Sequence, residues 1–201
     1  MNKYSSFASR RHVLAGGIVA ATTLALAPHE LFARQGPMLT PGCKDGDEPT
    51  IPETAGPYFK PQSPLRSDLR EPGIVGRPVE LTGQVLTRAC RPLAGALVDL
   101  WHANDSGQYD NKGFRLRGHL FTDAEGRYAF HTILPGLYPG RTRHYHVKVQ
   151  APGETALTTQ FYFPNEERNH TDGLFRPELV MQVADREDSL LAQFDVVLAA
   201  G

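Results

Sequence analysis

Short runs in which apolar and polar residues alternate recur along the chain from residue 79 onward. The clearest cover residues 79–86, 96–101, 126–133, 144–150, 157–163 and 193–198, and they are rich in β-branched and aromatic residues. Alternation with a period of two is typical of strands that bury one face. Turn-forming clusters at 123–126 and 151–154 separate some of these runs. The pattern predicts a mainly β fold, an antiparallel β-sandwich with few short helices.

Two other segments do not follow this alternation of apolar and polar residues. Residues 185–193, DREDSLLAQ, have an acidic start followed by apolar residues and are the best candidate for a single helical turn. Residues 34–64 contain seven prolines, so this stretch is predicted to be an extended or turning N-terminal arm rather than a helix. We therefore expect the sandwich domain to occupy residues 65–201.

The first residues have the order of an export signal. Arg10 and Arg11 precede an uncharged run from Val13 to Ala27, and the small residue Ala33 is the expected cleavage point. The run is shorter than the roughly 20 apolar residues of a membrane-spanning helix. SRRHVL also resembles the twin-arginine type of signal. We expect residues 1–33 to be removed on export to the periplasm or outside, with no stable membrane insertion afterwards. A membrane anchor or a cytosolic amphipathic start is the alternative.

Charge and cysteine content narrow the class of protein. The formal net charge is −1, with no basic cluster, which argues against a nucleic-acid partner. Cys43 and Cys90 are the two cysteines, and they form no CxxC motif. In an oxidising compartment they would pair, but two separate thiols fit the sequence equally well.

One strand-like run carries two histidines, His144 and His146, that are candidates for metal ligands. Residues i and i+2 of a strand project from the same face, so the two imidazoles are placed side by side. Zinc, copper and iron all accept imidazole. No carboxylate follows at the spacing of a cupin or of a two-histidine, one-carboxylate site, and no cysteine is placed for a blue-copper site.

The neighbouring loops contain tyrosines that could serve as the other metal ligands. Tyr138 lies in LPGLYPGR, and Tyr109 lies in the polar turn NDSGQYD after the run at 96–101. A phenol has a pKa near 10, so its binding as phenolate at neutral pH requires a strong Lewis acid. Ferric iron, Fe(3+), is the biological candidate, because two hard anionic phenolates neutralise its charge.

At these residues the sequence resembles a known family. ETAGPYF, ALVDLWHANDSGQYD, LPGLYPGRTRHYHVKV and TTQFYF together resemble the intradiol ring-cleavage dioxygenases. The β-subunit type of protocatechuate 3,4-dioxygenase is the nearest, with catechol and hydroxyquinol 1,2-dioxygenases as relatives. The similarity runs from about residue 52 to residue 164. It implies a non-haem Fe(3+) enzyme that uses O2 to cleave catechols between their hydroxyls, giving cis,cis-muconate-type products.

The resemblance also assigns residues. It implies iron ligands at Tyr109, Tyr138, His144 and His146. Tyr138 would leave the iron when the diol binds and act as a base. It places Arg141 beside the anionic ring and Gln160 behind the ligands, both as catalytic residues. A solvated loop charge is the other interpretation of Arg141, and strand packing is that of Gln160. Arg141 and Tyr58, in ETAGPYF, are candidates for substrate contact, while packing of the arm is the other interpretation of Tyr58.

Several features remain open to a plainer interpretation. Trp101 is expected in the core, and the arginines at 115, 117 and 143 are expected to be solvated. Tyr145, between the two histidines, should point to the opposite face. The rival hypothesis is a secreted transthyretin-like sandwich that binds without catalysis, because TDAEGRYAF resembles such modules. A homo-oligomer is possible. Only five residues separate Tyr138 from His144, which predicts an open pocket.

Overall fold

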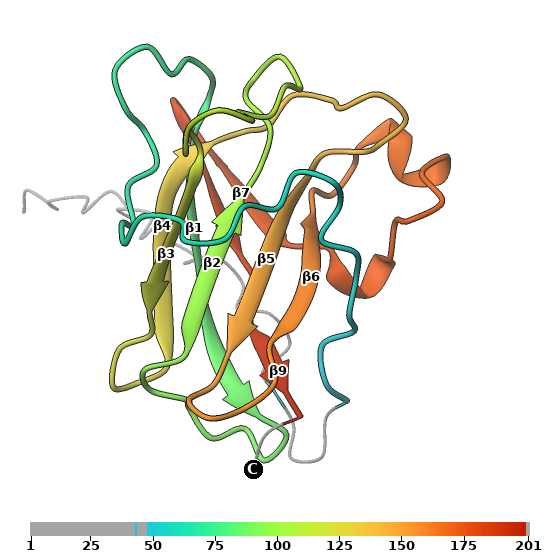
Figure 1. Cartoon of the computed structure of the whole chain (residues 1–201). Helices are drawn as coiled ribbons and strands as arrows, with labels where there is room; N and C mark the ends of the chain where they lie inside the picture. The colour runs from blue at the N-terminus through green and yellow to red at the C-terminus, as the bar shows by residue number, and fades with distance from the viewer. Residues whose placement is uncertain (1–42, 44–47, 200–201) are drawn as a thin grey trace, which may run out of the picture. The chain divides into compact units, whose positions relative to one another are not determined.

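Two β-sheets form the body of the protein in a computed structural model that describes residues 43 and 48–199 (Figure 1). The predicted signal, residues 1–33, and the arm up to Asp47 except Cys43 lie outside these residues. One sheet has the order β4-β1-β8-β7, with β9 beside β1. Its strands are β1 (Pro78–Thr87), β4 (Arg127–Ile133), β7 (Gln182–Arg186), β8 (Ser189–Gln193) and β9 (Val196–Leu198).

The second sheet carries the candidate ligands. Its order is β3-β2-β5-β6. The strands are β2 (Leu97–Trp101), β3 (Arg117–Phe121), β5 (His144–Gln150) and β6 (Leu157–Tyr162), and all their pairings are antiparallel. Two short 3-10 helices, η1 (Glu167–His170) and η2 (Pro177–Leu179), follow β6. The predicted β-sandwich with few short helices is confirmed.

The core lies between the two sheets and follows the alternation of the sequence. Leu81 and Phe130 come from one sheet, Leu100 and Val147 from the other, and all are fully buried. Burying one such side chain contributes about 1.5–3 kcal/mol. Tyr145 also points into this core, where its hydroxyl donates to the Ile133 carbonyl. The residues on either side of it therefore face outward.

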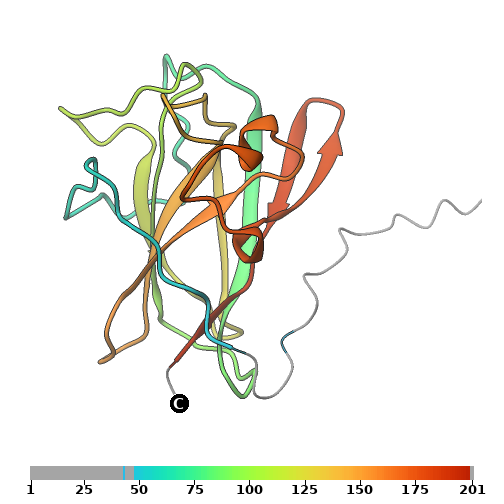
Figure 2. The same cartoon turned by 90° about the vertical axis from the view of Figure 1, so that its right-hand side faces the viewer.

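The helical turn predicted at 185–193 is wrong. This segment is the end of β7, a tight turn and β8, which form the antiparallel hairpin beside β1 in Figure 2. Leu190 and Ala192 alternate into the core, and β8 pairs in parallel with β1. Pairing of this segment with the buried strand β1 stabilises a strand more than its acidic first residues stabilise a helix. Those charged residues lie at the hairpin turn instead. The sandwich is thus not purely antiparallel, because β9 also pairs in parallel with β1.

The described part of the arm is extended, as its prolines predict. Thr50 donates its backbone N–H to Val197 and Glu53 donates to Thr158, so the arm is anchored at both sheets. It then crosses in front of β5 and β2 in Figure 1, where the Phe59 ring packs against Trp101. Residues 64–69 continue along the outer edges of β3 and β4.

The two cysteines form a disulfide that joins the start of the arm to the turn after β1. The Cys43 and Cys90 Cα atoms are 5.5 Å apart. The sequence left open a disulfide or two separate thiols, and the structure contains the disulfide. None of the helices in residues 48–199 is long and apolar enough to cross a membrane.

Candidate metal centre

His144 and His146 lie at the start of β5 on the outer face of the sheet and are both buried. Their Nε2 atoms are 3.2 Å apart. The His144 Nδ1 atom is 2.7 Å from the Thr142 carbonyl and must donate to it. In a neutral imidazole this leaves the Nε2 lone pair free to bind a metal. The spacing of the two histidines thus produces the shared face that the sequence predicts.

Tyr109 completes a group of three donor atoms. Its hydroxyl oxygen is 3.5 Å from His144 Nε2, and its ring lies 6.0 Å from that of His146. Tyr138 lies beside it, with 5.9 Å between the two phenol ring centres. All four side chains that the resemblance assigned as ligands therefore meet in one place. They come from the start of β5 and from two loops that precede it.

Glycines bring the two tyrosine loops together. Gly107 has φ +78°, and a Cβ there would lie 2.3 Å from the Leu137 carbonyl oxygen. On the facing loop, a Cβ at Gly136 would lie 2.3 Å from the Asp105 carbonyl oxygen, and the Gly136 N–H donates to Asn104. Only glycine permits this approach without a shift of backbone. The glycine before Tyr109 is therefore a structural requirement of the site.

Burial sets the charge of the ligands when no cation is present. It lowers the pKa of His144 to about 4, with a further contribution from the Arg141 charge. It lowers the pKa of His146 well below its usual value, and the charge of His144 adds to this. Burial raises the pKa of the Tyr109 phenol, while Arg141 and Arg117 oppose that shift. The imidazoles are therefore neutral near pH 7, and a phenolate would need the charge of a bound cation.

The donor set fits a metal that accepts phenolate. Within residues 43 and 48–199, no group of three or more histidine, cysteine or carboxylate side chains is placed to hold a metal. The donor side chains found beside the two histidines are the phenols of Tyr109 and Tyr138. Phenolate and imidazole together suit a hard, highly charged cation better than zinc or cuprous copper.

Tyr58 reaches the same place from the arm. Its hydroxyl is 2.9 Å from the Tyr138 hydroxyl, and its ring stacks on Tyr109 with 4.6 Å between centres. The hydrogen bond to Tyr138 is the main cause of a raised Tyr58 pKa. Tyr58 thus packs the arm directly against the two candidate tyrosine ligands.

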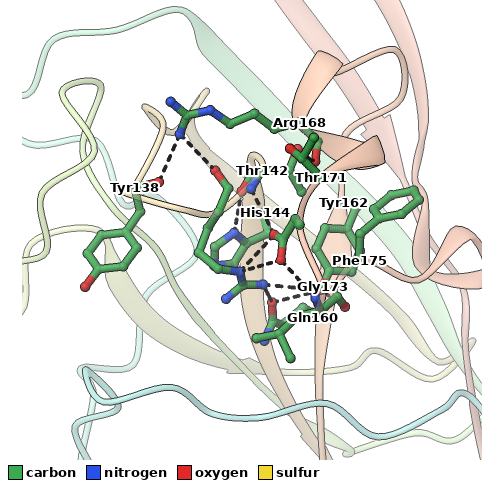
Figure 3. Close-up of polar contacts among 12 residues, drawn as sticks. Tyr138, Thr142, His144, Gln160, Tyr162, Arg168, Thr171, Gly173 and Phe175 are labelled. Atoms are coloured by element: carbon green, nitrogen blue, oxygen red, sulfur yellow. Dashed lines mark hydrogen bonds and ion pairs between the residues drawn. The ribbon is translucent and has the colours of Figure 1, made fainter.

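Arg141 is held on the other side of the histidines. Its Nε donates to Asp172 at 2.8 Å, and its Nη2 donates to Gln160 Oε1 at 2.6 Å. Gln160 in turn receives the Tyr162 hydroxyl and donates to the Thr54 carbonyl. Figure 3 shows this network around His144 and Gln160. Gln160 therefore orients Arg141 and the arm rather than contacting the ligands by a hydrogen bond.

The loop that carries Tyr138 is fixed by its backbone. Arg168, from η1, donates through Nη1 to the carbonyls of Tyr138 and Arg141, at 3.2 and 3.3 Å (Figure 3). The Arg141 N–H closes a turn onto the Tyr138 carbonyl. The backbone is thus anchored while the phenol itself is held by one hydrogen bond to Tyr58. Sequence reasoning missed Arg168 and Asp172, because nothing in their local pattern marks them.

Three other expectations need correction or refinement. Arg117 is 1% exposed and not solvated, because the arm and the Tyr109 loop cover it. Arg143 is partly buried and pairs with Glu166, whereas Arg115 is exposed as expected. Trp101 is buried, but on the outer face under the arm rather than between the sheets.

Comparison with known proteins agrees with this geometry. A family model described as Dioxygenase matches residues 54–200. The β chain of protocatechuate 3,4-dioxygenase from Burkholderia cepacia is 31% identical over 169 residues, which cover 67% of this chain and 72% of that protein. The hydroxyquinol 1,2-dioxygenase of Rhizobium sp. (strain MTP-10005) is 32% identical, over 71% of this chain and 54% of that protein. The chain thus spans about half of the latter enzyme.

Solved structures give the same result. The dioxygenase domain of a dioxygenase carbohydrate-binding protein fusion from Streptomyces sp. SirexAA-E is 51% identical. It has a TM-score of 0.75 and covers 77% of this chain and 100% of that one. Catechol 1,2-dioxygenase from Pseudomonas arvilla C-1 is 30% identical with a TM-score of 0.64, over 71% of this chain and 60% of that one.

Fold, site and relatives define an oxidoreductase of the dioxygenase class. More narrowly, the chain belongs to the intradiol ring-cleavage dioxygenase family. The rival hypothesis of a non-catalytic transthyretin-like binding module is not favoured by these relatives.

Proposed function

We propose that the protein is an exported Fe(3+) dioxygenase that cleaves catechol-type diols between their hydroxyls, with O2 as co-substrate. The observation that carries the proposal is the convergence of three donor atoms. His144 Nε2 lies 3.5 Å from Tyr109 Oη and 3.2 Å from His146 Nε2. Tyr138 would be the fourth protein ligand. Bound ferric iron would supply Lewis acidity and activate an aromatic diol toward O2.

The residues around the ligands have distinct tasks in this proposal. Thr142 fixes the tautomer and direction of His144 through its carbonyl. Trp101 lies flat against His146 and limits rotation of that ring. Tyr138 would accept a proton from a diol hydroxyl at its Oη atom, and Tyr58 would hold that oxygen through the hydrogen bond between their hydroxyls. Tyr58 would also contact the diol.

Arg141 would bind the anionic ring oxygen. Asp172 engages its Nε and Gln160 its Nη2, which leaves Nη1 for the substrate. A guanidinium stays charged and directional, so it stabilises negative charge that develops on the ring during reaction with O2. Gln160 acts through Arg141, because removing its side-chain carbonyl would free the guanidinium to rotate.

Export is proposed on separate grounds. The basic pair and short apolar run in residues 1–33 support it, as does the Cys43–Cys90 disulfide, since such bonds persist in oxidising compartments. In such a location the substrates would be catechols that arrive from outside the cell. A homo-oligomer is compatible with the proposal.

Purified protein loaded with ferric iron tests the function directly. Phenolate bound to ferric iron absorbs visible light, so the protein should be coloured and the colour should shift when a catechol is added. Oxygen uptake should match the formation of a cis,cis-muconate-type product mole for mole. A colourless protein that retains zinc or copper after native export would contradict the iron assignment, and a coloured protein without oxygen uptake would contradict the activity.

A further inference from the structure

The guanidinium of Arg117 joins the arm to the loop that carries Tyr109. Its Nη1 donates to the Tyr58 carbonyl at 2.6 Å, and its Nη2 donates to the Asp110 carbonyl at 3.1 Å. Tyr58 stacks on the candidate ligand Tyr109, and Asp110 follows Tyr109 in the chain. One planar side chain therefore fixes the backbone on both sides of the Tyr58–Tyr109 ring pair.

This arginine is buried in an unusual way. It is 1% exposed, and within residues 43 and 48–199 no carboxylate lies at ion-pair distance from it. Its Nε atom has no hydrogen-bond partner among those residues. A buried charge with no partner at ion-pair distance is costly, and the charges of Asp110 and Asp99 act on Arg117 only from farther away. A leucine or methionine would fill the same space without that cost, so packing alone does not account for an arginine here.

The position of Arg117 in the sheet explains how it can reach both segments. It is the first residue of β3 and pairs with Trp101, the last residue of β2. Beyond this point β2 leaves the sheet and becomes the loop with Tyr109. The arm passes over the same end of the sheet and packs Phe59 against Trp101. The guanidinium thus lies at an end of the sheet where it can bond to both segments.

We propose that Arg117 is a positioning residue that couples docking of the arm to the placement of Tyr109 and Tyr58. It touches neither the proposed metal nor the diol and acts through two backbone carbonyls. With the guanidinium in place, the stacked phenols form one wall of the site. Without it, the arm and the Tyr109 loop would move independently. The roles of Tyr58 and Tyr109 in this inference rest on the proposed function.

Hydrogen exchange on the metal-free protein tests the coupling without any catalysis. Arg117→Met removes both hydrogen bonds and keeps an unbranched apolar stem. Exchange in peptides that cover residues 53–60 and 104–113 should become about tenfold faster or more, because hydrogen bonds from a charged donor are lost. Exchange in β1 and β4 should be unchanged. Arg115→Met, which removes an exposed guanidinium two residues away, is the matched control and should resemble the parent.

Arg117→Lys keeps the charge but offers one ammonium in place of a fork. It should give an intermediate effect, in which one of the two segments recovers more than the other. With ferric iron bound, the KM for catechol should rise in Arg117→Met more than kcat falls, and the visible absorption band should shift. These effects should be absent in Arg115→Met.

Two results would overturn the inference. Parent-like exchange in both segments of Arg117→Met would show that the guanidinium does not hold them. Loss of protection spread evenly over the arm, the loop and strands β1 and β4 would show a general role in folding. If Arg117→Met does not fold, Arg117→Lys is judged by the same criteria. Failure of ring cleavage with a segment-specific exchange change would refute the proposed function but leave the coupling intact.

Discussion

The indole of Trp101 lies parallel to the imidazole of His146, with 5.1 Å between ring centres and 4° between planes. The two residues are cross-strand partners on β2 and β5, so the sheet register itself sets the stack. Phe59 of the arm also packs against the indole, with 4.9 Å between ring centres. A proposed metal ligand is therefore stacked on a strand neighbour, which the arm packs against in turn.

This stack makes Trp101 a reporter of the metal, because it is the only tryptophan in the chain. Binding of ferric iron at His146 should strongly quench its fluorescence through the adjacent ring. Zinc, which has a filled d shell, should change the emission far less when titrated into the same protein. The measurement is a fluorescence titration of metal-free protein. Equal emission with and without stoichiometric iron would place the iron elsewhere.

The two tyrosine ligands should respond differently to removal of the hydroxyl. Tyr109→Phe should damage the resting site and weaken its visible colour, because this phenol lies 3.5 Å from His144 Nε2 and is partly buried. Tyr138→Phe should keep iron but lower kcat/KM by roughly a hundredfold, the low end of what a positioned base contributes. Absorption spectra and steady-state kinetics distinguish the two. If both variants behaved like the parent, the ligand assignment would be wrong.

The sequence predicted which four side chains converge better than it predicted what surrounds them, for a physical reason. His144 and His146 follow from the two-residue period of a strand, and Tyr109 and Tyr138 come with glycines that the close approach of two loops requires. Arg117 was expected to be solvated, because the local pattern cannot show that an arm from another part of the chain will cover it.

The same limit explains the error in the fold. Residues 185–193 have the local chemistry of a helix start, yet they form a hairpin because β1 offers a buried partner with exposed backbone groups. That partner lies about a hundred residues earlier in the sequence, at 79–82. Local pattern therefore predicts which face of a strand is buried but not which strand lies beside it.

Stability should fall in mildly acidic solution because of His102. This residue is fully buried between the sheets, where Nδ1 donates to the Ala103 carbonyl and Nε2 lies 2.6 Å from Thr132 Oγ1. Burial lowers its pKa to about 3 from an unfolded value near 6.5. Above pH 6.5 both states are neutral. As the pH falls below 6.5, only the unfolded state binds the proton, so stability is lost progressively down to about pH 3.

The size of this effect can be isolated by substitution. At pH 5 the contribution of His102 to the free energy of unfolding should be about 2 kcal/mol lower than at pH 7. Urea unfolding of metal-free parent and His102→Gln at both pH values gives the difference directly. The variant should show a smaller loss between the two pH values. An identical loss in both proteins would mean that His102 can bind a proton in the folded state.

Reduction of the Cys43–Cys90 disulfide should destabilise the protein, because the bond closes a loop between residues 47 apart in sequence. A cross-link of this kind contributes about 2–4 kcal/mol, mainly by restricting the unfolded chain. For a domain of this size, that corresponds to a fall in Tm of roughly 5–15 °C. Calorimetry with and without reductant measures it, and Cys43→Ser/Cys90→Ser, which should not respond to reductant, is the control. A reductant-insensitive Tm in the parent would contradict the prediction.

Substituted catechols should be turned over at least as well as catechol itself. The short segment between Tyr138 and His144 covers little of the site, and the neighbouring Leu137 is 36% exposed. An open, partly apolar rim accepts ring substituents and gains binding energy from them.

The guanidiniums nearby are engaged: Arg143 pairs with Glu166, and Arg168 holds backbone carbonyls. Arg141 is assigned to the diol oxygen at the proposed iron site, so none of the three is left to select a substrate carboxylate. We expect kcat/KM values for hydroxyquinol and methylcatechols that equal or exceed the value for catechol, with protocatechuate accepted but not required. Steady-state kinetics on this panel, with the product of each reaction identified, provides the measurement. Turnover of protocatechuate alone would show that a cation does face the pocket and that the open-site argument fails.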